Sequence, residues 1–437
     1  MLCESAAKSL VQGDGFVRSQ NYSWRYSLAA TVLLLSPFDL LASLGMDMYL
    51  PVVPFMPDAL GTNAETIQLT LTTYLIMIGA GQLLFGPLSD RLGRRPVLLA
   101  GGAAYIVASI GLAVTSSAEL FLGLRIVQAC GASACLVATF ATVRDIYAGR
   151  DESNVIYGLL GSMLAMVPAV GPLLGTLVDT WLGWRAIFIL LGIGMIAACT
   201  AAWRLWPETR RQRTSDLQWS QLLFPMKRLN FWLYTLCYSA GMGSFFVFFS
   251  TAPRLMMGRQ GLSQLSFSLL FATVAIAMMG TARIMGRLIP RWGGLNTLRM
   301  GMGCLMAGAI FLVMSELWAP LSVLGFIAPM WLVGVGVATA VSVAPNGALR
   351  GFDHIAGAVT AVYFCLGGLL LGGIGTLIIA LLPSDTAWPI IAYCMILATV
   401  VLGLSCMNSA RHRRGNEVHD TVMLQGADCA QEEHGHD

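Results

Sequence analysis

Charged residues are scarce in this chain. Only 11% of its 437 residues are Asp, Glu, Lys or Arg, and 56% are hydrophobic, whereas soluble domains carry about 25% charged residues. Such a chain has too little polar surface for a soluble fold. The formal net charge of +3 is small, so the charge gives no reason to expect a nucleic-acid partner. The composition indicates an integral membrane protein.

Signatures of catalysis and metal binding are also lacking. Of the five histidines, His354 falls at a loop, and His412, His419, His434 and His436 lie in the polar C-terminal tail. The ten cysteines show neither metal-ligand spacing nor a disulfide framework. There is no nucleotide-binding P-loop. We therefore predict a protein that is not an enzyme, that holds no metal or cofactor, and that does not draw its energy from ATP.

Apolar segments of about 20 residues, the length of a membrane-spanning helix, recur along the chain. They lack the alternation of barrel strands. We predict spans at about 27–50, 67–87, 97–116, 120–143, 154–178, 185–206, 231–251, 267–289, 297–315, 321–348, 355–381 and 388–408. The fold class is thus an all-α integral membrane protein of twelve transmembrane helices.

The basic residues are distributed unevenly between the loops. The loops on one side hold only Arg185, Arg254 and Arg259, and Arg125 lies within a span. All other Lys and Arg residues fall on the opposite side. Because basic residues are enriched in cytoplasmic loops, this asymmetry predicts that both termini are cytoplasmic.

The chain divides into two similar halves. Gly86, Arg91 and Gly93, after the second span, recur at an offset of 200 residues after the eighth, as expected for a duplicated transporter. We predict two pseudo-symmetric six-helix halves. The predicted units are an N-terminal cytoplasmic tail (1–26), an N-terminal half (27–206), a cytoplasmic linker (207–230), a C-terminal half (231–408) and a disordered cytoplasmic tail (409–437).

Two carboxylates and one guanidinium lie inside predicted spans. A charge at mid-bilayer disfavours insertion by about 2.5–3.5 kcal/mol, so such residues usually have a function. Asp39 and Asp47 are about 12 Å apart along one helix and about 80° apart around it, so both can line one cavity. Arg125 enters from the other direction to a depth similar to that of Asp47, which predicts an ion pair or a water-bridged contact between them. A purely structural pair is the alternative. Asp39 has no cation in its own helix and is the better candidate for a proton carrier.

Aromatic residues crowd the seventh span around Phe245 and Phe249. With Tyr49, and with Tyr363 and Phe364 in the eleventh span, they suit a drug-sized aromatic ligand, although most membrane aromatics face lipid or other helices. We assign proton coupling to Asp39 and Asp47. The candidate substrate-binding residues are Asp39, Asp47, Arg125, Tyr49, Phe245 and Phe249.

The loop after the second span resembles the G-x-x-x-D-R-x-G-R-R motif of the major facilitator superfamily. Its residues here are Gly86, Asp90, Arg91, Gly93, Arg94 and Arg95. In that family the loop is a cytoplasmic latch that holds the halves together when the cavity opens outward, and Arg144-Asp145 resembles its charged partner. The alternative is that the arginines only set topology. Pro290 stands where the second-half copy would have its carboxylate, so the latch role is not extended to that copy.

The fifth span resembles the G-P-x-x-G motif associated in this superfamily with antiporters. Its residues are Pro168, Gly171, Pro172 and Gly175. Small residues permit close helix crossing, and prolines kink the helix.

Residues 21–408 resemble the non-enzymatic chloramphenicol exporters of this superfamily. The resemblance includes the runs 37–43, 140–145 and 342–349. It implies a drug:proton antiporter of the bacterial inner membrane that exports phenicol antibiotics by alternating access. We predict no obligate protein partner and therefore a monomer. Its partners would be the small-molecule drug, protons and the lipid bilayer. Two rivals remain, a broad multidrug exporter and an uptake symporter, and the fifth-span motif disfavours the second. A membrane enzyme fits least.

Overall fold

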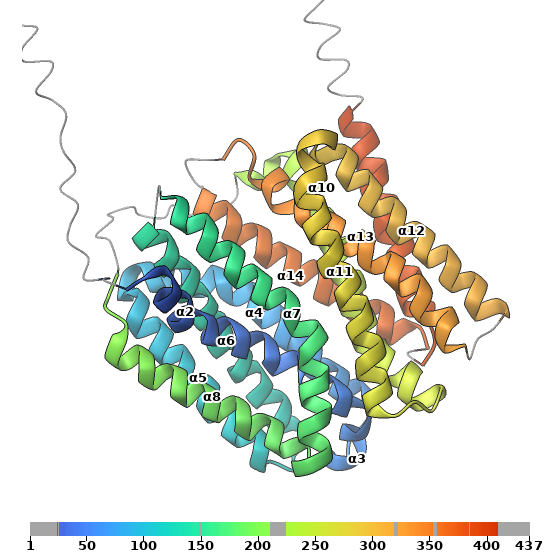
Figure 1. Ribbon diagram of the computed structural model, residues 1–437. Coiled ribbons are helices and arrows are strands. Elements are labelled where there is room, and N and C mark those ends of the chain that lie inside the picture. Colours follow the sequence, from blue (N-terminus) through green and yellow to red (C-terminus); the bar gives the residue numbers. More distant parts are fainter. Residues whose placement is uncertain are drawn as a thin grey trace, which may run out of the picture.

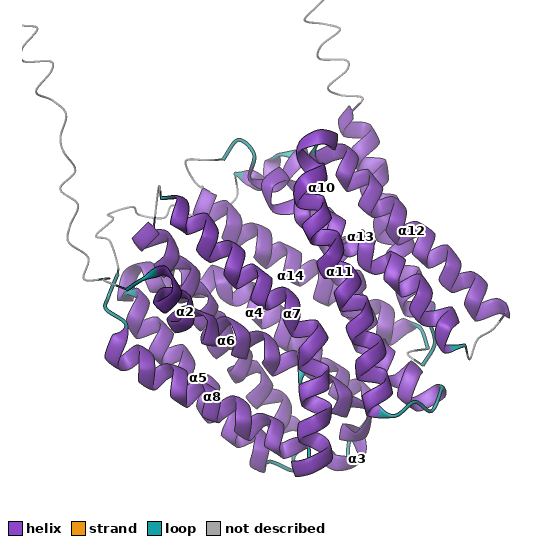
Figure 2. Cartoon of the chain, viewed as in Figure 1, coloured by secondary structure: helices purple, strands orange, loops and turns teal. Residues whose placement is uncertain are grey.

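The computed structural model describes residues 24, 26–147, 150–209, 224–318, 322–352, 356–383 and 385–409. Within these ranges the chain is helical and contains no strand (Figure 2). Twelve helices are long and apolar enough to cross a membrane, which confirms the predicted number. The chain is therefore a multi-pass membrane protein. Most of the predicted tails and most of the predicted linker lie outside the described residues.

Six membrane-spanning helices form the N-terminal half. They are α2 (Leu28–Asp47), α4 (Ala64–Leu92), α5 (Arg94–Val114), α6 (Ala118–Tyr147), α7 (Asp151–Leu182) and α8 (Trp184–Leu205). After Asp47 the first span tightens into a 3-10 helix, η1 (Leu50–Phe55), and the short helix α3 (Met56–Leu60). Pro51 and Pro54 account for this change, because proline cannot donate the next α-helical hydrogen bond.

The C-terminal half repeats this arrangement. It contains α10 (Leu229–Pro253), α11 (Gln264–Trp292), α12 (Gly294–Trp318), α13 (Val323–Leu349), α14 (Ala356–Leu381) and a last helix, Trp388–Ser409. The 3-10 turn η2 (Pro225–Lys227) precedes α10, and the π-helical turn η3 (Arg254–Arg259) follows it.

The internal repeat extends to the local structure. Helices α4 and α11 begin and end at positions 200 residues apart, and the side chains of Asn63 and Ser263 cap their N-termini. Both helices end at a glycine with positive φ, Gly93 (107°) and Gly293 (77°). Residues with a Cβ rarely adopt this backbone conformation, so these two glycines determine the sharp turns into α5 and α12.

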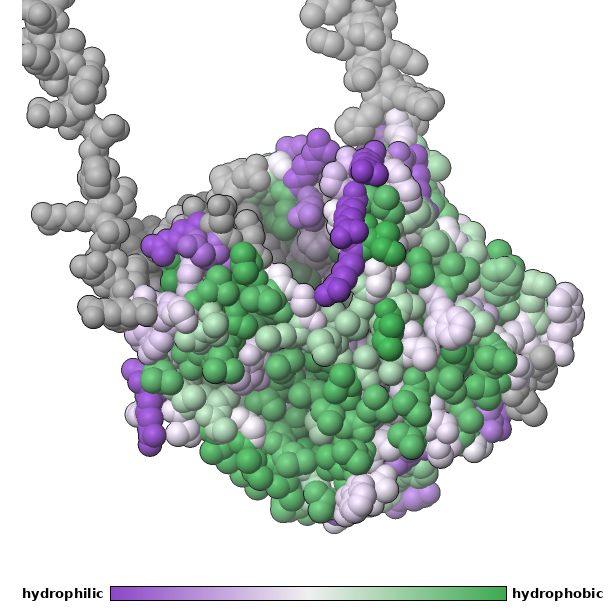
Figure 3. All heavy atoms as spheres, viewed as in Figure 1, coloured by the Kyte–Doolittle hydropathy of each residue, from purple (hydrophilic) through white to green (hydrophobic). Residues whose placement is uncertain are grey.

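The two ends of the bundle differ in charge. We call the end that carries Arg91, Arg144, Arg204 and Arg291 the arginine-rich face, and the end that carries α3 and Arg185 the opposite face. Figure 3 shows hydrophobic side chains covering much of the middle of the molecule, with hydrophilic ones gathered toward its ends and a recess between the halves at the arginine-rich face. This distribution fits a protein embedded in a bilayer.

The two halves converge toward the opposite face. In Figure 1, α7 and α11 lie close together near α3 and diverge toward the arginine-rich face. The hydroxyls of Thr176 and Ser268 lie 2.8 Å apart, and Gln264 donates to Asp179 at 2.8 Å. Each of these contacts joins α7 to α11 near the opposite face, so the halves are closed there.

A second seam between the halves runs along α4 and α14. A Cβ on Gly79 would lie 3.2 Å from the Cα of Gly368, so the two backbones cross with almost no side chain between them. Closer to the opposite face, the hydroxyls of Thr72 and Thr376 are 2.7 Å apart. The halves thus meet through small residues, which permit close backbone approach in membranes.

Candidate functional site

Asp39 is the most unusual polar residue of the membrane interior. It lies on α2, which packs against α6, α7 and α8, and it is only 1% exposed. Neither carboxylate oxygen has a hydrogen-bond partner within the described residues. Burial disfavours the charged form of such a group unless a partner compensates it. Asp39 therefore stays the candidate for proton coupling that the sequence indicated.

Asp47 ends α2 at the point where α7 crosses it. A Cβ on Gly171 would lie 2.5 Å from the Cβ of Asp47, and a Cβ on Gly175 would overlap the backbone carbonyl of Met48. The two glycines of the fifth-span motif therefore allow the end of α2 to pack closely against α7. This agrees with the expectation that small residues in this motif permit close helix crossing.

The other side of α7 faces the C-terminal half. Ala169 and Leu173 pack with Ala272 and Ala275 of α11, and Pro172 contributes its carbonyl oxygen to the hydroxyl of Ser268 at 3.2 Å. Helix α7 therefore connects Asp47 directly to the contact that closes the opposite face.

Arg125 is fully buried in α6 and is held by neutral groups. Its Nη1 donates to the Gly45 carbonyl at 2.9 Å and to Oε1 of Gln128 at 2.7 Å. The guanidinium lies over the rings of Tyr74 and Tyr49, at 4.3 and 5.0 Å from the ring centroids. Nε and Nη2 have no hydrogen-bond partner within the described residues.

The predicted ion pair of Asp47 with Arg125 is absent from the ion pairs of the described residues, so this expectation was wrong for direct contact. The reason is that a backbone carbonyl, an amide and two aromatic faces surround the guanidinium. These groups stabilise a buried cation without a carboxylate.

Two tyrosines, Tyr74 and Tyr105, hold α2 in place near these charges. Sequence reasoning missed both of them. The hydroxyl of Tyr74 donates to the Ala42 carbonyl and that of Tyr105 to the Leu41 carbonyl, each at 2.7 Å. These carbonyls lie between Asp39 and Asp47. The sequence carries no signal for these bonds, because the acceptors are backbone atoms of a distant helix.

The predicted substrate aromatics lie in different surroundings. Tyr49 is fully buried, and its ring lies 5.0 Å from the Arg125 guanidinium. Its hydroxyl is 3.4 Å from the Thr70 hydroxyl. Phe249 is 2% exposed and packs edge-on against Phe271, 6.1 Å between centroids. Phe245 is only half-buried. Phe245 is therefore better placed than Tyr49 and Phe249 to meet a ligand in this conformation.

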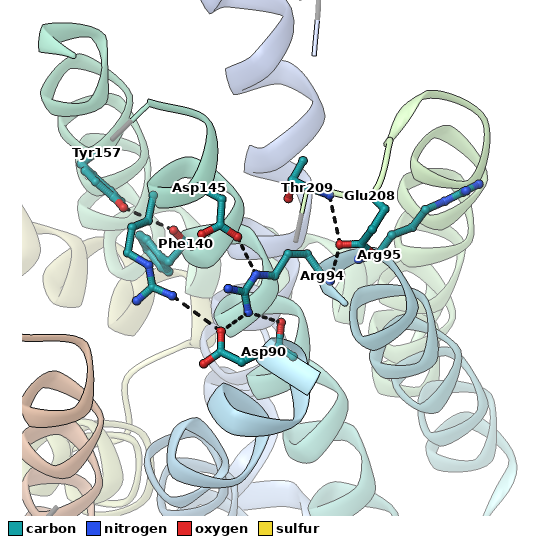
Figure 4. Close-up of polar contacts among 10 residues, drawn as sticks. Asp90, Arg94, Arg95, Phe140, Asp145, Tyr157, Glu208 and Thr209 are labelled. Atoms are coloured by element: carbon teal, nitrogen blue, oxygen red, sulfur yellow. Dashed lines mark hydrogen bonds and ion pairs between the residues drawn. The ribbon is translucent and has the colours of Figure 1, made fainter. Parts of the chain in front are cut away.

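The loop motif forms a charged cluster at the arginine-rich face. Arg94, whose side chain is 5% exposed, donates from Nε to Asp145 at 2.7 Å and pairs through Nη1 with Asp90 at 2.6 Å (Figure 4). Nη1 also donates to the Ser89 hydroxyl at 3.1 Å. Arg144 lies 3.9 Å from Asp90, where both side chains are about half exposed. The cluster thus joins the ends of α4, α5 and α6.

Glu208 completes this cluster, although no pattern in the sequence singles it out. Its carboxylate accepts hydrogen bonds from the backbone N–H groups of Arg94 at 2.9 Å and Arg95 at 3.1 Å (Figure 4). It therefore caps the N-terminus of α5, where the helix dipole favours an anion. A Cβ on Gly93 would lie 2.5 Å from Oε2 of Glu208, so the glycine is needed for space as well as for its backbone conformation.

The charged pairs of this cluster bind within the N-terminal half. The ion pairs of Arg94 and Arg144 join α4, α5 and α6, while the halves diverge at this face. The predicted latch between the halves stays a prediction for another conformation. In this conformation the motif holds the ends of α4, α5 and α6 together within the N-terminal half.

We expect Arg94→Gln to destabilise the protein strongly, because it leaves the buried Asp145 carboxylate without its cation. Removing one partner of a buried ion pair costs about 3–5 kcal/mol. Arg144→Gln is the matched control, because pairs between exposed side chains contribute about 0–1 kcal/mol. The melting temperatures of the purified variants in detergent measure both effects. Equal melting temperatures would contradict the bracing role.

Helices in two repeated halves, intramembrane carboxylates and a charged turn after the second span define a membrane transporter. The Major Facilitator Superfamily model matches residues 38–376, and the chain belongs to this family. A chloramphenicol resistance protein of Pseudomonas aeruginosa is 80% identical over 410 residues, covering 94% of this chain and 98% of that protein.

More distant relatives extend this comparison. Multidrug resistance protein D of Escherichia coli (strain K12) is 29% identical over 359 residues, covering 81% of this chain and 89% of that protein. The crystal structure of a D-xylose-proton symporter matches with a TM-score of 0.69 at 14% identity, covering 86% of this chain and 97% of that chain. The structural match confirms the predicted fold.

Proposed function

We propose that this protein exports chloramphenicol and related phenicol antibiotics in exchange for protons. The observation that carries the proton coupling is Asp39, a carboxyl buried in α2 without a hydrogen-bond partner in the described residues. The relative at 80% identity, named for chloramphenicol resistance, supports the substrate. The α7 motif resembles that of antiporters and supports exchange.

We infer that the protein lies in the bacterial inner membrane with its arginine-rich face in the cytoplasm. Enrichment of arginine in the loops of that face supports this orientation. With this orientation, the halves diverge toward the cytoplasm and close near Thr176 and Ser268 on the outside. The conformation is then the one that admits drug from the cytoplasm.

Drug and proton are exchanged if the cavity can hold only one of them at a time. In the cytoplasm-facing state, Asp39 releases its proton and drug binds. In the outward-facing state, Asp39 takes up a proton and drug leaves. One proton moving down a potential of about 100 mV supplies about 2.3 kcal/mol, which sustains a gradient of about 50-fold for an uncharged drug.

Drug uptake into inside-out membrane vesicles tests this function. Radiolabelled chloramphenicol should accumulate inside the vesicles when their interior is made more acidic than the medium. A protonophore should abolish this accumulation. Vesicles that carry Asp39→Asn protein serve as the control for coupling. Accumulation that is indifferent to the proton gradient would refute proton exchange, and no drug movement at all would refute phenicol export.

A broader multidrug exporter is the second candidate, supported by the similarity to multidrug resistance protein D. A panel of cationic dyes in the same vesicles separates the two. Dye accumulation comparable with that of chloramphenicol would favour the broader function.

A further inference from the structure

Three exposed arginines follow one another along the end of α11. Arg283, Arg287 and Arg291 are spaced four residues apart, so each lies about one helical turn beyond the previous one on the same side of the helix. None of the ion pairs formed by the described residues includes them. Figure 3 shows hydrophilic side chains extending from the arginine-rich face over this part of α11. We call Arg283, Arg287 and Arg291 the arginine stripe.

The side of α11 that carries the stripe is exposed along the whole span. Leu265, Leu269 and Ile276 are each more than half exposed. Arg283 follows Leu265 by 18 residues, which is five full turns at 3.6 residues per turn. The same separation joins Arg287 to Leu269, and Ile276 lies within about 20° of both sides. Because exposed apolar side chains of a membrane span face lipid, the stripe lies on the lipid-facing side of α11.

The depth of the stripe matches the border of the hydrocarbon layer. At 1.5 Å per residue, Arg283 is about 27 Å from Leu265 along the helix, and the hydrocarbon layer is about 30 Å thick. With Leu265 at the edge near the opposite face, Arg283 lies at the other edge and Arg291 about 12 Å beyond it. A guanidinium at this depth extends toward the headgroups while its methylene stem lies on apolar surface. Lipid phosphates are therefore within reach of the stripe.

The second half provides no carboxylate near the stripe within its described residues. Only Glu316 and Asp385 are acidic there, and both follow stretches of helix that end at the opposite face. Glu316 pairs with Arg259 at 3.0 Å. In the first half Asp90 balances arginines of the charged cluster, but Pro290 takes its place in the second half. The stripe is therefore an excess of positive charge at the membrane border.

The first half lacks counterparts of Arg283 and Arg287. At the offset of 200 residues, Leu83 and Pro87 of α4 stand in their place, and only the outermost arginine is repeated, as Arg91. Helix α4 nevertheless begins, ends and is capped at its N-terminus as α11 is. The repeated scaffold therefore does not need arginine at these two positions.

We propose that the arginine stripe binds an anionic phospholipid of the leaflet at the arginine-rich face. Cβ atoms four residues apart on a helix are about 5–6 Å apart, so Arg283 and Arg287 can donate to one phosphodiester group. Guanidinium donors match the geometry of phosphate oxygens, and Arg291 adds attraction farther out in the headgroup layer. A headgroup without a cation of its own is favoured, because this end of the second half is itself positively charged. The acyl chains then lie along Ile276.

Lipid binding to the purified full-length protein in detergent tests this site. Native mass spectrometry counts the lipid molecules retained when dioleoyl-phosphatidylglycerol or dioleoyl-phosphatidylcholine is titrated. These two probes have the same acyl chains, and the protein should prefer phosphatidylglycerol. The double variant Arg283→Gln/Arg287→Gln should bind phosphatidylglycerol about 25-fold more weakly, because each arginine near an anionic headgroup contributes about fivefold. Its binding of phosphatidylcholine should be unchanged.

The matched control removes two other exposed arginines of the same face, in Arg150→Gln/Arg204→Gln. It changes the net charge by the same amount and should keep the preference. Arg283→Lys/Arg287→Lys should retain part of the preference, because the charge stays while the forked donors are lost. In 1 M NaCl the unaltered protein should also bind phosphatidylglycerol more weakly, since the Debye length falls to about 3 Å. This last measurement does not depend on the folding of any variant.

The outcomes separate the possibilities. Loss of the preference in Arg283→Gln/Arg287→Gln alone supports the site. No preference in the unaltered protein, an unchanged preference in this variant, or an equal loss in both glutamine variants overturns it. Displacement of the lipid by glycerol 3-phosphate would also overturn it, because the phosphate alone would then be enough. None of these measurements involves drug or protons, so failure of this site would leave the proposed export standing.

Discussion

Gly175→Ala is expected to reduce drug export at least about tenfold. A methyl group at this position would overlap the backbone carbonyl of Met48, immediately after Asp47. Backbone atoms cannot rotate away as a side chain does, so α2 and α7 would have to separate, and overpacking of this kind is destabilising. The minimum inhibitory concentration of chloramphenicol, together with the amount of protein in the membrane, measures the loss.

Gly161→Ala is the matched control in the same helix. A Cβ at Gly161 meets nothing within 4 Å, and alanine has the higher helix propensity by about 1 kcal/mol. This variant should keep full resistance. If Gly175→Ala kept the same resistance as Gly161→Ala, the close packing of α2 against α7 would not be needed for transport.

Asp39→Asn is expected to abolish proton-driven export while leaving the protein folded. Asparagine has almost the shape of aspartic acid but cannot release a proton, and the buried Asp39 carboxylate has no partner whose bond would be lost. Accumulation against a gradient should fall to background. Exchange of labelled for unlabelled drug across the membrane should weaken as well, because asparagine resembles the protonated form of Asp39, from which drug is expected to leave.

The control for this variant is Asp58→Asn, since Asp58 is exposed on the short helix α3. It should leave both accumulation and exchange unchanged. Proton-driven accumulation by the Asp39→Asn protein would transfer the coupling role to another carboxylate, with Asp47 the next to test. Full exchange by the Asp39→Asn protein would mean that protonation of Asp39 is not what releases drug.

Local patterns in the sequence were enough to predict the helices and the repeat. Hydropathy defines each span within a few residues, and Gly93 and Gly293 mark equivalent turns because each needs a backbone conformation that other residues rarely adopt. The fifth-span glycines were correctly interpreted as a close crossing. Their partner, the end of α2 at Asp47, could not be inferred from spacing.

The partners of the buried charges were beyond sequence reasoning. Arg125 binds the Gly45 carbonyl, and every residue has a carbonyl, so no pattern distinguishes this one. Glu208 caps α5 across more than one hundred residues of chain, and only the packing of α8 against α5 brings it there. Tyr363 was noted as one aromatic among several, but its lack of an acceptor is visible only in three dimensions.

The two halves carry different chemistry on one repeated scaffold. Asp39, Asp47, Arg125 and the charged cluster all belong to the first half, whereas Pro290 replaces the cluster's carboxylate in the second. The aromatic residues around Phe245 lie in the second half. If proton coupling rests on Asp39 as proposed, substitutions in α10 and α14 are expected to change the range of exported antibiotics without changing proton coupling. Resistance to a new drug would then arise through changes in the second half of the chain.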